Sequence, residues 1–72
     1  MAQNYAYHYA EIDLVTNMCV GVQTTTKEMD PDNNPTWVEI PVYDPEYLFK
    51  FYINGAWYED AEGTIPWESS LL

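Results

Sequence analysis

The sequence predicts a small, mainly β protein: an antiparallel sheet of two hairpins plus one strand, with one short helical turn. Two observations carry this prediction. Short segments alternate between apolar and polar residues with a period of two, which is typical of half-buried strands. An Asn-Gly pair at 54–55 lies between alternating aromatic residues, which is the strongest short-range signal for a hairpin. The chain has 72 residues, so one domain with a small core is the most that it can form.

The first hairpin is predicted from residues 5–24. Between residues 5 and 12, three tyrosines fall on one face of a strand, and Ala6, His8, Ala10 and Ile12 fall on the other. Residues 13–17 supply turn formers. Within residues 18–24, positions 18, 20 and 22 are apolar, and Gly21 indicates a bulge or a point of close approach. We therefore expect two antiparallel strands joined by a loop of about five residues.

The middle of the chain predicts a loop, a strand and a helical turn. Residues 25–35 are polar, rich in helix and strand breakers and without periodicity, which indicates a loop. Alternation resumes at residues 36–40, and Pro41 then removes a backbone donor, which confines that end to an edge or a strand terminus. Asp44 followed by Pro45 is the pattern of an N-cap with proline at the first helical position.

The second hairpin is centred on Asn54-Gly55, two residues that tolerate the positive φ of a type I′ turn. Counting outward fixes the register, which pairs Ile53 with Ala56, Tyr52 with Trp57, Phe51 with Tyr58 and Lys50 with Glu59. Tyr52 and Trp57 share one face, and the opposite face is more apolar. Residues 1–63 are thus predicted to form the β-rich domain. Residues 64–72 form an apolar tail that is expected to dock on the sheet or on another chain.

Charge excludes whole classes of function. The formal net charge is −10, and the two cations, Lys27 and Lys50, cannot grip a phosphate backbone or an anionic membrane. No direct nucleic-acid or membrane binding is therefore expected. Apolar residues make up 47% of the chain, which is too many for a disordered acidic tail. A single cysteine and the lack of a signal-peptide pattern predict a cytoplasmic protein when it is synthesised.

Catalytic and metal-binding patterns are weak. His8 is the one histidine and lies between alanines, and Cys19 has an apolar context with no nearby cation to activate it. Residues 30–34 superficially resemble a calcium loop, but the twelfth position from Asp30 is Pro41 instead of a bidentate glutamate. We therefore expect no enzyme, no metal and no cofactor.

Aromatic residues are the more informative feature, because tyrosine and tryptophan combine a large apolar surface with a polar tip that suits protein interfaces. The alternative is that these rings merely cover a thin, one-sided sheet. We expect an aromatic patch within an acidic rim, which contacts a protein with a basic surface, and unpaired strand edges also favour a homo-oligomer. The predicted contact residues are Tyr5, Tyr7, Tyr9, Trp37, Trp57, Trp67, Glu59 and Asp60.

A further resemblance rests on short motifs within residues 5–59. These motifs are Tyr9-Ala10-Glu11-Ile12, Cys19-Val20-Gly21-Val22, Val38-Glu39-Ile40-Pro41, Tyr43-Asp44, Tyr47-Leu48, Lys50-Phe51-Tyr52 and Asn54-Gly55-Ala56-Trp57. Their layout resembles small proteins and terminal modules of tailed phages that infect Gram-positive gut bacteria. The resemblance implies a phage-encoded, non-catalytic protein, associated with the tail or the virion. The alternative is an acidic anti-defence inhibitor, either anti-CRISPR-like or a nucleic-acid mimic, which blocks a basic groove of a host enzyme.

Overall fold

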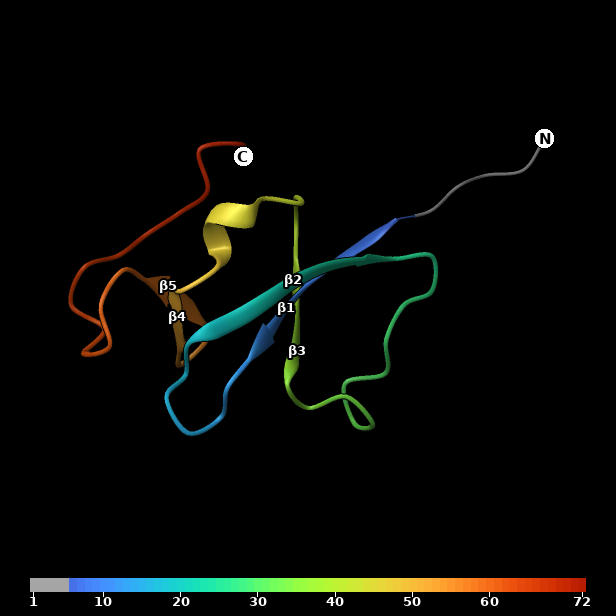
Figure 1. The fold of residues 1–72 in the computed structure, drawn as a ribbon, viewed down its shortest axis with the longest axis horizontal. Helices are drawn as coiled ribbons and strands as arrows, with labels where there is room; N and C mark the ends of the chain where they lie inside the picture. The colour runs from blue at the N-terminus through green and yellow to red at the C-terminus, as the bar shows by residue number, and fades with distance from the viewer. Residues whose placement is uncertain (1–5) are drawn as a thin grey trace.

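The computed structural model describes residues 6–72 and confirms the mainly β prediction (Figure 1). Five short strands form two antiparallel sheets, and one 3-10 turn lies between the sheets in the sequence. The three-stranded sheet has the order β2-β1-β3, and the second sheet pairs β4 with β5. The elements are β1 (Tyr7–Ile12), β2 (Cys19–Thr25), β3 (Trp37–Ile40), η1 (Pro45–Tyr47), β4 (Phe51–Ile53) and β5 (Ala56–Tyr58).

The central strand of the larger sheet is β1, which pairs with β2 on one edge and with β3 on the other. Its alternation sorts residues as predicted, since Ala10 and Ile12 are buried in the core. Strand β2 follows β1 directly through the turn at residues 13–18, so the first hairpin is confirmed. The loop at 26–36 then brings β3 back to the free edge of β1, where Tyr9 pairs with Glu39 and Glu11 with Trp37.

A β-bulge in β2 corrects the predicted alternation of that strand. Glu11 pairs with Gly21 and Ile12 pairs with Cys19, so Val20 is the extra residue between the two pairs. The expected apolar face at positions 18, 20 and 22 is therefore wrong. Cys19 is buried and Val22 packs against the core, whereas Val20 is 47% exposed.

The second hairpin has the predicted register for its three strand pairs, Phe51 with Tyr58, Tyr52 with Trp57 and Ile53 with Ala56. Its turn residues have φ values of 51° at Asn54 and 83° at Gly55, as a type I′ turn requires. Local turn chemistry thus accounts for the register of this hairpin.

Main-chain hydrogen bonds join the two sheets. The Cys19 amide donates to the Lys50 carbonyl at 2.8 Å, and the Phe49 amide donates to the Cys19 carbonyl at 2.9 Å. The Tyr52 amide donates to the Asn17 carbonyl at 2.9 Å, and Met18 forms a β-bridge with Phe51. The start of β2 therefore pairs with the segment that leads into β4, and the two sheets turn their inner faces toward one core.

The core lies between these inner faces. Its buried members are Ala10, Ile12, Cys19, Ile40 and Tyr47, and its half-buried members are Val22, Val38, Tyr52, Trp57 and Trp67. Tyr47 is central to the aromatic part, because its ring lies 4.8 Å from the ring of Trp57 and 4.9 Å from that of Trp67, both edge to face.

The helical turn and the C-terminal segment close the open side of this core. Asp44 caps the turn at Pro45–Tyr47 as predicted, by accepting a hydrogen bond from the Glu46 amide at 2.9 Å. In the tail, Pro66 forms a bridge with Tyr58, and the Trp67 amide donates to Trp57 at 3.0 Å. The tail thus pairs with β5 and adds a third, short extended segment to the β4–β5 sheet.

Candidate functional site

The candidate site is the outer face of the three-stranded sheet, which points away from the core. Residues that pair directly across antiparallel strands point to the same face, so the pairs Tyr9–Glu39 and Glu11–Trp37 place all four side chains there. Tyr7 belongs to the same face through the alternation of β1. Two strands therefore bring together aromatic and acidic residues that stand more than 25 positions apart in the sequence.

This face contains a hollow of about 490 Å³, which we call the acidic hollow. Its lining residues are Tyr9, Glu28, Met29, Asp30, Pro31, Trp37 and Glu39. Strands β1 and β3 supply the two rings and Glu39, and the loop at 26–36 supplies the remainder. Three carboxylates and no cation stand among the lining residues, so the hollow is a region of negative potential beside aromatic surface.

The aromatic part of the hollow is held firmly. The rings of Tyr9 and Trp37 pack at a centroid distance of 5.7 Å with an angle of 53° between their planes. The Tyr9 hydroxyl accepts a hydrogen bond from the Met29 amide at 2.8 Å, which ties the loop to the sheet. Tyr9 therefore positions both its neighbouring ring and the loop that carries two of the acids.

The three carboxylates of the hollow have different local roles. Asp30 organises its own loop, because its carboxylate accepts hydrogen bonds from the Asp32 amide and from the Asn33 side chain, each at 2.9 Å. Glu28, Asp30 and Glu39 are all exposed. The three carboxylates are consequently placed to meet a cation that enters the hollow.

Glu11 adds a fourth carboxylate next to the hollow. It lies between Gly21 on β2 and Trp37 on β3 in one row across the sheet. A side chain at position 21 would meet the Glu11 carboxylate, since a Cβ built there lies 3.6 Å from Glu11 Oε1. That distance is an ordinary van der Waals contact, so Gly21 is not a point of close approach; it adjoins the bulge at Val20, the other alternative predicted for it.

The predicted contact residues fall into separate places. Tyr7 and Trp37 lie half-buried on the outer face, and Tyr5 lies outside the described residues. The prediction of Tyr9 as an exposed contact needs correction: the side chain is only 3% exposed, because Trp37 and the loop at 26–36 cover it. Tyr9 supports the hollow without offering much surface to a partner.

The remaining predicted residues belong to the other sheet. Trp57 and Trp67 pack on Tyr47 and so form part of the interior aromatic cluster. Glu59 is exposed at the end of β5. Asp60 folds the loop that follows, because its carboxylate accepts hydrogen bonds from the amides of Thr64 and Ile65, each at 2.9 Å. Hydrogen bonds from Thr64, first from its side chain, lower the pKa of Asp60.

Sequence reasoning missed the acids that line the hollow. Glu39 was detectable, because it alternates with Trp37 along a predicted strand and must share its face. Glu28 and Asp30 carry no such signal, since their place depends on how an irregular loop folds back over β1. The hollow therefore combines aromatic surface with acids that were not among the predicted contact residues.

The two reactive side chains considered earlier are engaged in the fold. His8 Nδ1 lies 2.9 Å from the Thr24 hydroxyl, and its ring packs edge to face on Tyr43 at 6.3 Å. Burial raises the pKa of the Cys19 thiol, whose Sγ donates to the Gly21 carbonyl at 3.2 Å. A thiol of this kind is a poor nucleophile.

Within residues 6–72, no group of three or more histidine, cysteine or acidic side chains is arranged to hold a metal ion. Over the same residues, no helix has the length and apolar character needed to cross a membrane. Comparisons of the chain with protein-family models, with curated proteins and with solved structures find no match, so the geometry of these surfaces is what bears on function.

Proposed function

We propose that the chain is a non-catalytic protein-binding module, which receives a basic side chain of its partner in the acidic hollow. One observation carries the proposal: a hollow of about 490 Å³ combines the Trp37 ring with the carboxylates of Glu28, Asp30 and Glu39. An arginine or lysine side chain is the protein group that matches both properties, since its apolar stem packs on a ring and its charged end meets carboxylates.

The physical basis is a combination of two moderate interactions. A guanidinium or ammonium group over a tryptophan face contributes about 0.5–2 kcal/mol, depending on how far it is desolvated. Exposed ion pairs contribute less, about 0–1 kcal/mol each, and act mainly through steering of a basic partner. The packing of Trp37 on Tyr9 fixes the ring before binding, so little conformational entropy is lost at this position.

The biological setting of this module is proposed from the sequence resemblance alone. It is a phage-encoded protein that is made in the host cytoplasm and acts at the tail or in the virion. The net charge of −10 and the carboxylates of the hollow favour a second candidate, an anti-defence inhibitor whose carboxylates occupy a basic groove of a host enzyme. The two candidates differ in their partner and in the salt dependence of binding.

The test compares partner capture by matched variants. The full chain is immobilised, exposed to lysate of phage-infected host cells, and the retained proteins are identified by mass spectrometry. Trp37→Ala removes the ring of the hollow, and the double variant Glu28→Gln/Glu39→Gln removes two of its charges. The matched control, Glu46→Gln/Glu68→Gln, makes the same change of charge at two exposed residues outside the hollow.

We expect one defined partner to be retained by the wild-type chain and by the control, and to be lost or weakened about tenfold by both hollow variants. Equal retention by the wild-type chain and the hollow variants would refute the proposal. A phage structural partner whose affinity changes little with salt supports the tail-associated role. A host enzyme whose affinity falls steeply as salt is raised supports the inhibitor.

A further inference from the structure

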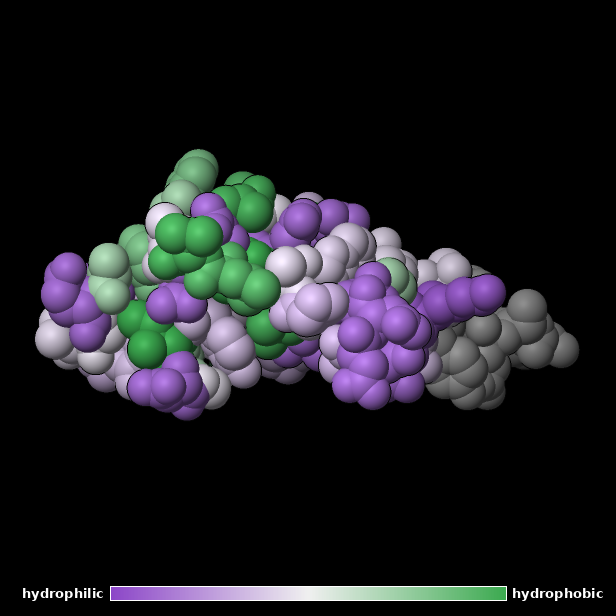
Figure 2. All heavy atoms as spheres, turned by 90° about the horizontal axis from the view of Figure 1, so that it is seen from below, coloured by the Kyte–Doolittle hydropathy of each residue, from purple (hydrophilic) through white to green (hydrophobic). Residues whose placement is uncertain are grey.

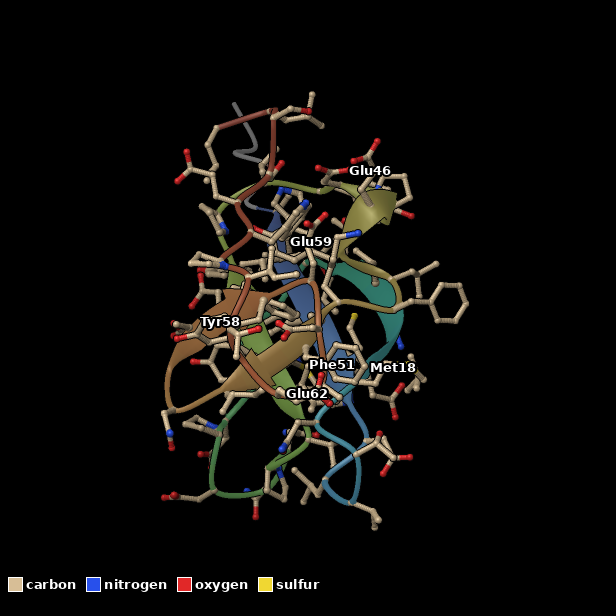
Figure 3. All side chains as sticks on the ribbon, turned by 90° about the vertical axis from the view of Figure 1, so that its left-hand side faces the viewer. Met18, Glu46, Phe51, Tyr58, Glu59 and Glu62 are labelled. Carbon is tan, nitrogen blue, oxygen red and sulfur yellow. The ribbon has the colours of Figure 1, made fainter. Side chains whose placement is uncertain are left out.

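A second surface lies on the outer side of the β4–β5 sheet. Met18 bridges to Phe51, and Phe51 pairs with Tyr58, so the three side chains stand in one row across successive antiparallel pairs. The next row holds Tyr52 and Trp57, which pack against the core. Because successive residues of a strand point to opposite faces, the row of Met18, Phe51 and Tyr58 points outward (Figure 3).

Two more apolar side chains adjoin this row where β2 meets the segment before β4. Val20 is 47% exposed and Phe49 is 66% exposed. They lie near one another, because the Phe49 amide donates to the carbonyl of Cys19, the residue before Val20. Hydrophobic side chains gather in the part of the molecule that holds the β1–β2 turn and β4–β5, with hydrophilic side chains among them (Figure 2). We call Met18, Val20, Phe49, Phe51 and Tyr58 the outer apolar face.

The backbone at Phe49 makes this exposure costly. Its φ of 70° places it in the left-handed region, directly after the C-cap Leu48 of the helical turn. Glycine or asparagine is the usual residue at such a position, because the left-handed conformation brings the Cβ of other residues too close to the backbone. Phe49 therefore combines backbone strain with a largely exposed ring, and the fold of this chain gains little from either property.

The charges around this face indicate what can cover it. Glu62 precedes Gly63, which lies against Tyr58, so one carboxylate stands at the margin of the face (Figure 3). Glu59 directly follows Tyr58 and so belongs to the opposite side of the strand. Lys50 is turned away from it, because its Nζ lies 5.2 Å from the centre of the Trp67 ring. A second copy of the chain would bring two acidic margins together, and an anionic membrane would be repelled. A partner with a basic margin is attracted.

We propose that the outer apolar face docks an amphipathic segment of a partner protein, whose apolar side is flanked by lysine or arginine. The rings and aliphatic side chains of the face supply the contact area, with Phe49 as the anchor. Glu62 and the net charge of −10 favour a segment with basic flanks. The face lies across the core from the acidic hollow, since each is the outer side of one of the two sheets. The chain can therefore hold a partner on each side.

The test uses two amphipathic helical peptides, one of leucine and lysine and one of leucine and glutamate, titrated into the full chain by calorimetry. Phe49→Gly removes the anchor and also relieves the strained backbone, so the variant folds at least as well as the wild type. The matched control is Asn54→Gly, which makes the same kind of change at another residue of positive φ, in the β4–β5 turn away from the face.

We expect the leucine–lysine peptide to bind the wild-type chain and Asn54→Gly equally, and Phe49→Gly about tenfold or more weakly. The leucine–glutamate peptide should not bind. The same difference between Phe49→Gly and Asn54→Gly should remain when each is combined with Trp37→Ala, which separates this face from the acidic hollow. Equal binding by Phe49→Gly and the wild type would overturn the proposal. So would concentration-dependent dimerisation that Phe49→Gly abolishes, since the occupant would then be a second copy.

Discussion

Ser69→Ala should destabilise the chain far more than its place near the C-terminus suggests. The Ser69 side chain is 2% exposed, and its hydroxyl donates to Asp44 Oδ2 at 2.5 Å, while Asp44 itself is 3% exposed. The substitution leaves a buried carboxylate oxygen without its donor. An unsatisfied buried group of this kind costs about 1–3 kcal/mol, with charged groups toward the upper end. The same hydroxyl also accepts from the Leu71 amide at 3.1 Å, so the last residues lose an anchor as well.

The assay is urea unfolding followed by tryptophan fluorescence, with the free energy of unfolding extrapolated to water. Small domains are stabilised by about 0.05–0.15 kcal/mol per residue, which gives about 4–11 kcal/mol for 72 residues. A loss of about 1–3 kcal/mol is therefore a large part of the total. Ser70→Ala is the matched control, because Ser70 is exposed. If Ser69→Ala and Ser70→Ala lower the free energy of unfolding by the same amount, the buried hydrogen bond does not stabilise the tail as argued.

Further predictions concern titration and turn geometry. Burial, and to a lesser extent the charge of Asp44, raises the pKa of Tyr47 above its usual value of 10.0. The unfolded chain thus releases the phenolic proton of Tyr47 at a lower pH than the folded chain does. The free energy of unfolding therefore falls as the pH rises past about 10. This fall should be smaller in Tyr47→Phe when unfolding is measured as a function of pH. The pKa of Asp60 is lowered, so its contribution to stability is present above the unfolded value of 3.8 and lost as the pH falls through the folded one. Thr64→Val should raise the pKa of Asp60 in a carboxylate NMR titration; an unchanged value would exclude Thr64 as the main cause. Gly63→Ala should destabilise the chain more than Gly55→Ala in thermal unfolding. Both positions have positive φ, but only at 63 does an added Cβ meet a side chain, at 3.2 Å; the reverse order would argue against this contact.

Local signals in the sequence account for the elements that were predicted well. Asn54 and Gly55 specify both the type and the register of their hairpin, because a two-residue turn admits one alignment of the strands. Asp44 and Pro45 likewise specify a helical turn through capping and a fixed φ. The residues that make these interactions lie within a few positions of each other, so the interactions can be predicted from the sequence.

The acidic hollow and the bulge were not predictable in this way. The extra residue at Val20 reverses the apparent alternation of β2, and Gly21 was its one visible sign. The position of Glu28 depends on a long-range hydrogen bond between Met29 and Tyr9, which no periodic pattern encodes. The aromatic residues were predicted to form one contact set, yet Trp57 and Trp67 pack against the core. They do so because the tail folds back and pairs with β5.

The backbone hydrogen bonds between Cys19 and residues 49–50 couple the unfolding of the two sheets. Neither sheet can open without breaking bonds that belong to the other, so the chain should lose its structure in a single all-or-none step. Amide protons at Cys19 and Tyr52 should accordingly exchange with solvent at similar, slow rates. Insertions between residues 26 and 36 leave these bonds untouched, so they should change the acidic hollow without dividing the unfolding into two steps.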